Sequence, residues 1–391
     1  MAFDRALFGS KVRRLRKIRE LSIEELADEM GLAPSRLDEL ETGRTAPTGD
    51  EVLILAAVFQ EDFRFFISGD IAAPVEEAEL LYRMHGEEFS KADRYALQEF
   101  LYLCRSAEEL ATLLGRATSP RFVAPQPEVA TYGRSRRTAM RRATADGRAA
   151  AEAVRRELAL ADNAVAADIF ELGRRLGVHI FRRKLGNSSK VSGLFLQHPT
   201  AGPCVLVNHS EDLYRQRFSA AHELGHAIMD RGRGVVVSLE SDRDALIERR
   251  ANAFAAALLI PARVAATLPV DGSSADAEIL KWAEKLQVNV FTLCLSLAEA
   301  RKMTFAEARD KGRSLRLPRD TKRDPELLRG SGTRLGARRE SALRRGLSHH
   351  YVSMVFDALE QRMITTARAA EVLLVTPLEV REMALAFGRV A

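Results

Sequence analysis

The sequence predicts a mainly helical α+β protein in which a small β-sheet lies between two helical regions. Three observations predict this class. Short stretches with helix caps and a period near 3.6 residues fill residues 10–68 and most of the chain after residue 280. Apolar segments of strand length, at 178–181, 193–196 and 204–208, occur only in between. With 391 residues, 46% of them hydrophobic, the chain is too long for one core and too apolar for disorder.

The N-terminal helices are expected from their caps. Ser22 and Glu25 form a capping box, Gly31 ends a helix, and Pro34 can begin the next one. Periodicity and caps together predict the following helices: 10–19, 22–30, 34–42, 49–59, 75–115, 149–158, 164–176, 216–231, 242–259, 366–372 and 377–386. The last two have a helix-turn-helix cadence with a capping box at Thr376 and Glu379, but few basic residues.

These elements divide the chain into five expected parts. They are an all-helical N-terminal domain, a helical connector that could serve in dimerisation, a Pro- and Arg-rich linker, a central domain with the sheet, and a basic segment with C-terminal helices: 1–70, 71–117, 118–148, 149–310 and 311–391. The linker is expected because three prolines are followed by six arginines with few large apolar residues.

Composition and charge exclude several classes of protein. The longest apolar stretches, 52–59 and 253–260, are far short of the roughly 20 residues of a membrane span, and no signal peptide is evident. We therefore expect a cytoplasmic protein with no membrane partner. Three scattered cysteines offer neither a disulfide framework nor a cysteine zinc cluster. Residues 311–345 hold twelve Lys and Arg against four Asp and Glu, which favours a polyanion partner or a solvated linker.

The strongest chemical signal is the pattern H-E-x-x-H at His222, Glu223 and His226, on an expected helix. Positions i and i+4 of a helix share one face about 6 Å apart, so both imidazoles can bind one tetrahedral zinc ion. Glu223 is rotated by about 100° and would face the open coordination position. The alternative is a pair of histidines on a helix surface.

A second helix supplies a candidate third ligand. Glu248 begins the pattern E-x-x-A-N-x-F-A, and a carboxylate from a neighbouring helix can complete a His₂Glu site. Asn252, one turn later, is placed to accept a hydrogen bond from the outer ring nitrogen of a ligand histidine. Two alternatives stay open: Glu248 as an exposed acid paired with Arg243 or Arg249, and a different third ligand among Glu240, Asp242 and Asp244.

Such a centre predicts peptide hydrolysis. Zinc, or manganese in its place in vitro, would acidify water and polarise a peptide carbonyl, while Glu223 takes the water proton and passes it to the leaving amine. Gly225 is expected to keep the helix slim near the open position. The sequence offers three candidate donors for the developing oxyanion without discriminating among them: His198, His209 and Tyr214.

Two short helices with a three-residue turn, at 22–30 and 34–42, predict a helix-turn-helix that binds double-stranded DNA. The start of the second helix would enter the major groove, and the basic helix before the pair would bind phosphates. The candidate contacts are Arg13, Arg14, Lys17, Ser35 and Arg36. The alternative is a small module that binds protein.

Two groups of residues resemble known families. The first resembles the XRE-type (phage-repressor-like) helix-turn-helix family: Leu21-Ser22-x-Glu24-Glu25-Leu26-Ala27, Gly31-Leu32, Glu41-Thr42-Gly43-Arg44 and Pro47. The second resembles the ImmA/IrrE metallopeptidase family: Arg217-Phe218-Ser219-x-Ala221-His222-Glu223-Leu224-Gly225-His226, Glu248-x-x-Ala251-Asn252-x-Phe254-Ala255 and Leu258-Leu259-Ile260-Pro261. The sequence departs from the first family at Ile23, where a Gln is usual, and at the acidic Asp38 and Glu39 of the reading helix.

The resemblance implies a zincin-like domain with His222, His226 and Glu248 as metal ligands and Glu223 as the catalytic carboxylate. It further implies a DNA-binding regulator, expected as a homodimer, whose zinc endopeptidase cleaves a repressor or another partner protein in a stress or mobile-element response. Two alternatives remain, a non-proteolytic regulator whose peptidase-like domain senses a metal or a ligand, and an antitoxin-like protein that binds a partner. The complete set of four residues favours the peptidase, because a sensor could lose Glu223 without losing its metal.

Overall fold

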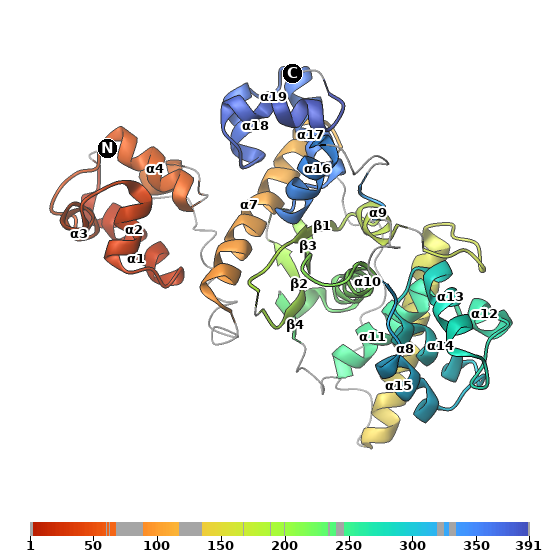
Figure 1. Cartoon of the computed structure of the whole chain (residues 1–391). Coiled ribbons are helices and arrows are strands. Elements are labelled where there is room, and N and C mark those ends of the chain that lie inside the picture. The colour runs from red at the N-terminus through yellow and green to blue at the C-terminus, as the bar shows by residue number, and fades with distance from the viewer. Residues whose placement is uncertain are drawn as a thin grey trace. The chain divides into compact units, whose positions relative to one another are not determined.

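Figure 1 shows the computed structural model of the chain, which describes these residues: 3–59, 61, 63–67, 89–116, 135–166, 168–187, 189–198, 200–233, 235–239, 246–318, 324–327 and 334–389. The chain divides into two compact units, Met1–Arg105 with Leu185–Ser189, and Ser106–Lys184 with Lys190–Ala391. Across the described residues, no helix combines the length and the apolar character that crossing a membrane requires. The mainly helical α+β class that the sequence predicts is confirmed.

The first unit contains the helices predicted at 22–30, 34–42 and 49–59, the basic first helix, which begins at Arg5 and not at residue 10, and a further short helix that the sequence did not predict. They are α1 (Arg5–Ile18), α2 (Ile23–Met30), α3 (Pro34–Glu41), α4 (Gly49–Phe59) and α5 (Phe63–Ile67). The capping box of Ser22 and Glu25 is formed, and Gly31 ends α2 in the left-handed conformation with φ 67°. The helices enclose one apolar core, whose buried side chains include Phe8, Leu15, Leu26, Leu37, Leu40 and Leu55.

A four-stranded sheet lies in the second unit, with strand order β1-β3-β2-β4. The strands are β1 (His179–Arg183), β2 (Val191–His198), β3 (Gly202–Asn208) and β4 (Val235–Leu239). β1 pairs with β3 in parallel, whereas β2 is antiparallel to both β3 and β4. The sequence predicts the first three strands, but the edge strand β4 was missed, although three consecutive β-branched valines begin it.

Four helices build the centre of the second unit: α8 (Arg136–Glu157), α9 (Ile169–Arg175), α10 (Leu213–Met229) and α11 (Leu246–Leu259). α10 packs on β2 and β3, and α11 packs against α10 on one side and α8 on another. Their buried side chains form a continuous core with those of the sheet, including Phe170, Phe195, Leu224 and Phe254. The sheet and α11 therefore hold α10 between them.

The expected linker at 118–148 is wrong for its last part, because residues from Arg136 onward belong to α8. A stripe of small residues lets this helix pack closely on α11: Ala139, Ala143, Gly147 and Ala151, all buried. A Cβ atom at Gly147 would lie 2.2 Å from the carbonyl oxygen of Arg250. Arg136, Arg137, Arg141 and Arg142 are exposed, so the composition of this stretch suits a helix with one tightly packed face. Residues 117–134 lie outside the described part.

In the described part of the chain, the remaining α-helices are α7 (Lys91–Leu113), which contributes to both units, and eight helices after α11. These are α12 (Ala262–Thr267), α13 (Asp276–Leu286), α14 (Val290–Glu299), α15 (Phe305–Ser314), α16 (Arg334–Arg344), α17 (His349–Glu360), α18 (Thr366–Val372) and α19 (Pro377–Ala386). The two expected C-terminal helices and the capping box at Thr376 and Glu379 are confirmed. The expected connector helix begins at Lys91 in the described residues, and its start falls within the undescribed residues 68–88.

The basic segment is not wholly a solvated linker. Asp324 and Glu326 both bind the guanidinium of Arg182, at 2.7 and 2.8 Å, and that side chain is only 1% exposed. Glu326 also accepts a hydrogen bond from Arg174 at 2.8 Å. Burial would raise the pKa of Glu326, but the two guanidinium groups outweigh it and lower that pKa. These ion pairs fix residues 324–327 to β1 and α9.

Candidate functional site

The H-E-x-x-H motif occupies the last turns of α10, where this helix is enclosed by the sheet and α11. The side chain of Phe254 on α11 lies against Gly225, at which a Cβ atom would approach the ring to 3.0 Å. Gly225 therefore allows α11 to approach α10 closely, and its expected role beside an open coordination position stays a prediction. The short distance between the helices brings Glu248 opposite the two histidines.

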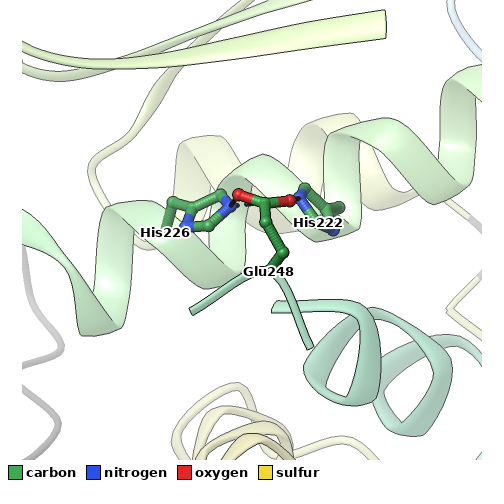
Figure 2. A group of neighbouring side chains, drawn as sticks. All are labelled: His222, His226 and Glu248. Carbon is green, nitrogen blue, oxygen red and sulfur yellow. Dashed lines mark hydrogen bonds and ion pairs between the residues drawn. The ribbon is translucent and has the colours of Figure 1, made fainter. Parts of the chain in front are cut away.

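Figure 2 shows His222, His226 and Glu248 converging on one point. The two Nε2 atoms lie 3.0 Å apart, and the oxygens of Glu248 lie 3.1 Å from Nε2 of His222 and 3.2 Å from Nε2 of His226. Bonds of about 2.05 Å at tetrahedral angles would place zinc ligands about 3.3 Å apart. Within the described residues, this is the group of three side chains whose donor atoms could share a metal ion. The donor types and spacings therefore fit zinc.

The alternatives that the sequence left open have different outcomes. His222, His226 and Glu248 are all buried, which contradicts both a surface histidine pair and an exposed Glu248. The competing acids Glu240, Asp242 and Asp244 lie outside the described residues, as does Arg243.

The outer nitrogen of each histidine has its own carboxylate or amide partner. Nδ1 of His222 lies 3.1 Å from Oδ1 of Asn252, as the sequence spacing predicts. Nδ1 of His226 lies 2.9 Å from Oδ2 of Asp230, which also binds the buried Arg250. Each contact places an N–H on Nδ1 and leaves the lone pair of Nε2 for a metal. Asp230 was missed in the sequence, although it follows His226 by one helical turn.

These contacts also shift the pKa values of two of the candidate ligands. Burial would lower the pKa of His226, but its hydrogen bonds with Asp230 and Glu248 raise that pKa to about 10. Burial opposes ionisation of Glu248, yet hydrogen bonds with both histidines lower its pKa. Both shifts have the same cause, the short contacts that join these buried groups.

Glu223 lies beside this centre and is 0% exposed. Its carboxylate packs on the backbone of β2 at Gly193, where an added Cβ atom would lie 2.5 Å from Oε1. Gly193 therefore gives Glu223 its space, and sequence alone could not reveal this because the contact depends on how β2 lies on α10.

We expect Gly193→Val to displace the Glu223 carboxylate and thereby abolish the peptide hydrolysis that the sequence predicts, because a buried side chain has little room to move. The ligands stand on α10 and α11, so about one metal per chain should still bind. Metal analysis and a cleavage assay check this, with Ser192→Val on the same strand as the control. Wild-type activity in Gly193→Val would contradict the steric role.

Two of the three candidate oxyanion donors, His198 and Tyr214, have partners away from the metal ligands. Nδ1 of His198 accepts a hydrogen bond from the backbone N–H of Ala201 at 3.0 Å, and the hydroxyl of Tyr214 lies 3.5 Å from the carbonyl oxygen of Glu284. Burial, with the charge of Arg182, lowers the pKa of His209 to about 4. The contacts of His198 and Tyr214 thus involve backbone groups and not the metal ligands.

A cavity of about 1020 Å³ adjoins the centre through Glu248 and Asn252. Phe218 also lines it, and the ring of Phe218 lies 6.4 Å from that of His222 between centroids. Its further walls are largely apolar and come from α14 and from the segment that follows α15: Val290, Phe291, Leu295, Leu315 and Leu317. Three arginines also line it: Arg215, Arg249 and Arg316. The cavity is large enough for a bulky side chain.

The helix-turn-helix geometry predicted for α2 and α3 is present, with a turn at residues 31–33. Arg13, Arg14 and Lys17 are exposed on α1, and Ser35 is exposed at the start of α3. Arg36 differs, because its guanidinium forms two hydrogen bonds of 2.8 Å with Glu51. It also donates to Thr45 at 2.7 Å. The hydrogen bonds of Arg36 thus link α3 to α4. They do not support the expected role of this side chain in reading bases.

Comparison with known proteins agrees with both assignments. Residues 174–297 match the family model described as IrrE N-terminal-like domain, and residues 12–66 match the one described as Helix-turn-helix. The chain matches none of the curated proteins compared with it. The three candidate metal ligands, Glu223 and Asn252 all lie within the first match. The chain thus carries an XRE-type helix-turn-helix at its N-terminus, followed by a domain of the ImmA/IrrE metallopeptidase type.

Proposed function

We propose that this chain is a DNA-binding regulator whose second unit is a zinc-dependent endopeptidase, and that it cleaves a repressor or another partner protein in a stress or mobile-element response. The observation that carries the proposal is the buried convergence of His222, His226 and Glu248 beside the carboxylate of Glu223. A metal sensor would need the first three residues alone.

In this proposal His222, His226 and Glu248 hold the ion, while Asn252 and Asp230 orient the two rings. When bound, zinc supplies Lewis acidity, which polarises a peptide carbonyl and makes water more acidic. Glu223 accepts the proton of the attacking water and delivers it to the leaving amine. Its burial against β2 fixes the carboxylate in one position and keeps bulk water away from the proton transfer.

The experiment that tests this function mixes the purified full-length chain with XRE-type repressors of its host. Zinc, manganese or a chelator is added, and cleavage is followed on a gel and by mass spectrometry of the fragments. We expect a single cleavage that requires metal. A chain that binds metal but cleaves none of these proteins would favour the sensor function.

The apolar cavity beside Glu248 supports a substrate with a large apolar side chain near the cleaved bond. We expect Leu295→Trp, which reduces the cavity, to weaken cleavage of such substrates by roughly 10–200-fold, the usual effect of apolar pocket contacts. Small side chains should be affected less. Cleavage of a peptide library checks this, with Leu280→Trp on α13 as the matched control. An unchanged cleavage profile would exclude the cavity as the binding site.

For DNA, we expect binding to a palindromic operator that weakens steeply with salt. Replacing Arg13, Arg14 and Lys17 together by Ala should weaken binding to all sequences alike, and should lower the salt slope by ~0.9 for each phosphate that the variant no longer neutralises. Titrations at several salt concentrations measure this. The matched control replaces three exposed basic residues of the second unit, Arg263, Lys281 and Arg309. If both variants lost DNA affinity equally, the basic residues of α1 would have no particular role in binding DNA.

A further inference from the structure

The C-terminal pair α18 and α19 repeats the geometry of α2 and α3 at one constant offset along the chain. Ser22 and Thr365 cap the first helix of each pair by accepting from the backbone N–H three residues later. Gly31 and Leu374 occupy the left-handed conformation in the turn, with φ 67° and 55°. Pro34 and Pro377 begin the second helices.

The backbone and the core of the two pairs agree as well. In the turns, the N–H of Leu32 donates to the carbonyl of Ala27 at 2.9 Å, and that of Val375 donates to the carbonyl of Ala370 at 3.0 Å. The buried positions coincide at the same offset: Leu26, Ala27, Leu37 and Leu40 correspond to Ala369, Ala370, Val380 and Met383. The second unit therefore contains a second helix-turn-helix motif, in addition to the one that the family comparison finds.

The exposed face of α19 is unsuited to DNA. Leu378, next to the helix start, is 87% exposed, and Leu385 is 59% exposed. The acidic Glu379 and Glu382 lie on the exposed side of the same helix and would repel phosphate. Exposed leucines of this kind are more typical of a surface that binds protein. The helix that would read bases in a DNA-binding motif thus presents leucines and carboxylates where phosphate contacts would require basic residues.

This face is complementary to itself. Leu378, Arg381, Glu382 and Leu385 fall at positions i, i+3, i+4 and i+7, so they share one side of α19. If two copies of α19 meet in antiparallel fashion about a two-fold axis between Arg381 and Glu382, each Leu378 faces the other copy's Leu385. Each Arg381 then faces the other copy's Glu382. Apolar contacts lie at the ends and opposite charges at the centre, as an isologous interface requires.

The charges within one chain leave Arg381 available for this contact. Among the ion pairs of the described residues, none involves Arg381, whereas Glu382 pairs with Arg338 on α16. That pair is partly exposed, and such a pair contributes little to stability, so Glu382 can also receive a second guanidinium. The connector helix α7, which the sequence suggested for dimerisation, is less accessible in the part that belongs to the second unit. Its side chains Ala107 and Leu110 are buried within the chain.

We propose that a second copy of this chain docks on the α19 face, defined by Leu378, Arg381, Glu382 and Leu385, and forms a two-fold dimer. A ten-residue helix covers less than the roughly 800 Å² per partner of a standard interface. The dimer therefore forms reversibly and depends on concentration. The proposal concerns assembly alone and does not require the second unit to cleave any protein.

The first test measures the mass of the full-length chain over a range of concentrations by analytical ultracentrifugation. The wild type should pass from monomer to dimer, and Leu378→Asp with Leu385→Asp should raise the dimer dissociation constant by on the order of 100-fold. The matched control is Leu53→Asp, which changes an exposed leucine on α4 and should leave the dimer unaffected. Circular dichroism and metal content confirm that each variant is folded.

A charge exchange separates self-association from other occupants of this face. Arg381→Glu alone and Glu382→Arg alone each place like charges opposite each other twice and should weaken the dimer, whereas the double variant should restore it. Restoration is specific to a second copy, because a different partner would meet two reversed charges. A wild-type chain that stays monomeric up to its solubility limit overturns the proposal. So does a dimer that survives both aspartate substitutions, or a double variant no better than the single ones.

Discussion

Glu223→Gln should abolish hydrolysis while leaving the metal in place. The amide keeps the size of the carboxylate but cannot accept the proton of the attacking water, so we expect kcat/KM to fall by about 10²–10⁴-fold. Glu223 packs on β2 and its carboxylate is not among the three converging donors, so the metal content should stay near one ion per chain. Cleavage kinetics and metal analysis on the same preparation measure both quantities.

The control for this variant is Glu278→Gln, an isosteric change on the exposed side of α13. It should behave as the wild type does in both assays. Activity equal to the parent in Glu223→Gln would exclude the proposed proton transfer, and loss of metal would show that this carboxylate serves the ion itself.

Replacing His222 and His226 together by Ala should remove the metal completely. Two of the three converging donors disappear, and the remaining carboxylate of Glu248 cannot hold zinc alone. Removing only the outer partner, in Asn252→Ala, should have a smaller effect, a loss of about 10–100-fold in affinity. Metal analysis after dialysis against a weak chelator distinguishes the two cases.

One result with the double alanine variant would contradict the proposed metal site. Full occupancy in the double alanine variant would mean that the ion binds elsewhere in the chain. A natural control is His198→Ala, which removes a buried histidine on β2 that has its own backbone partners. This variant should keep its metal.

Local sequence patterns predicted those parts of the molecule that depend on local physics. Capping residues set the ends of helices, and α4, α18 and α19 begin and end where the sequence indicates. Helical spacing likewise places His222, His226, Glu248 and Asn252 on facing sides of two helices. The side chains that were found from sequence are those whose roles follow from positions within one or two turns.

The residues that were missed depend on contacts between distant segments. Gly193 matters because β2 crosses α10 at Glu223, and Arg182 can be buried because Asp324 reaches it from far along the chain. Neither relation leaves a periodic signal in the sequence. Composition was misleading for α8, because a helix that packs through alanine and glycine needs few large apolar residues. Arg36 was assigned to DNA by its position, but its partner Glu51 lies on another helix.

The packing of α8 on α11 determines how far the peptidase domain can be shortened. A fragment limited to the matched range 174–297 would lack α8. It would therefore expose to solvent the side of α11 that packs on α8, and α11 is the helix that carries Glu248. It would also lack Glu326 and leave the guanidinium of Arg182 buried without its acids, a loss that typically costs about 3–5 kcal/mol. We therefore expect the smallest autonomous form of this domain to extend at least from Ser135 to Leu327, well beyond the segment that sequence comparison delimits.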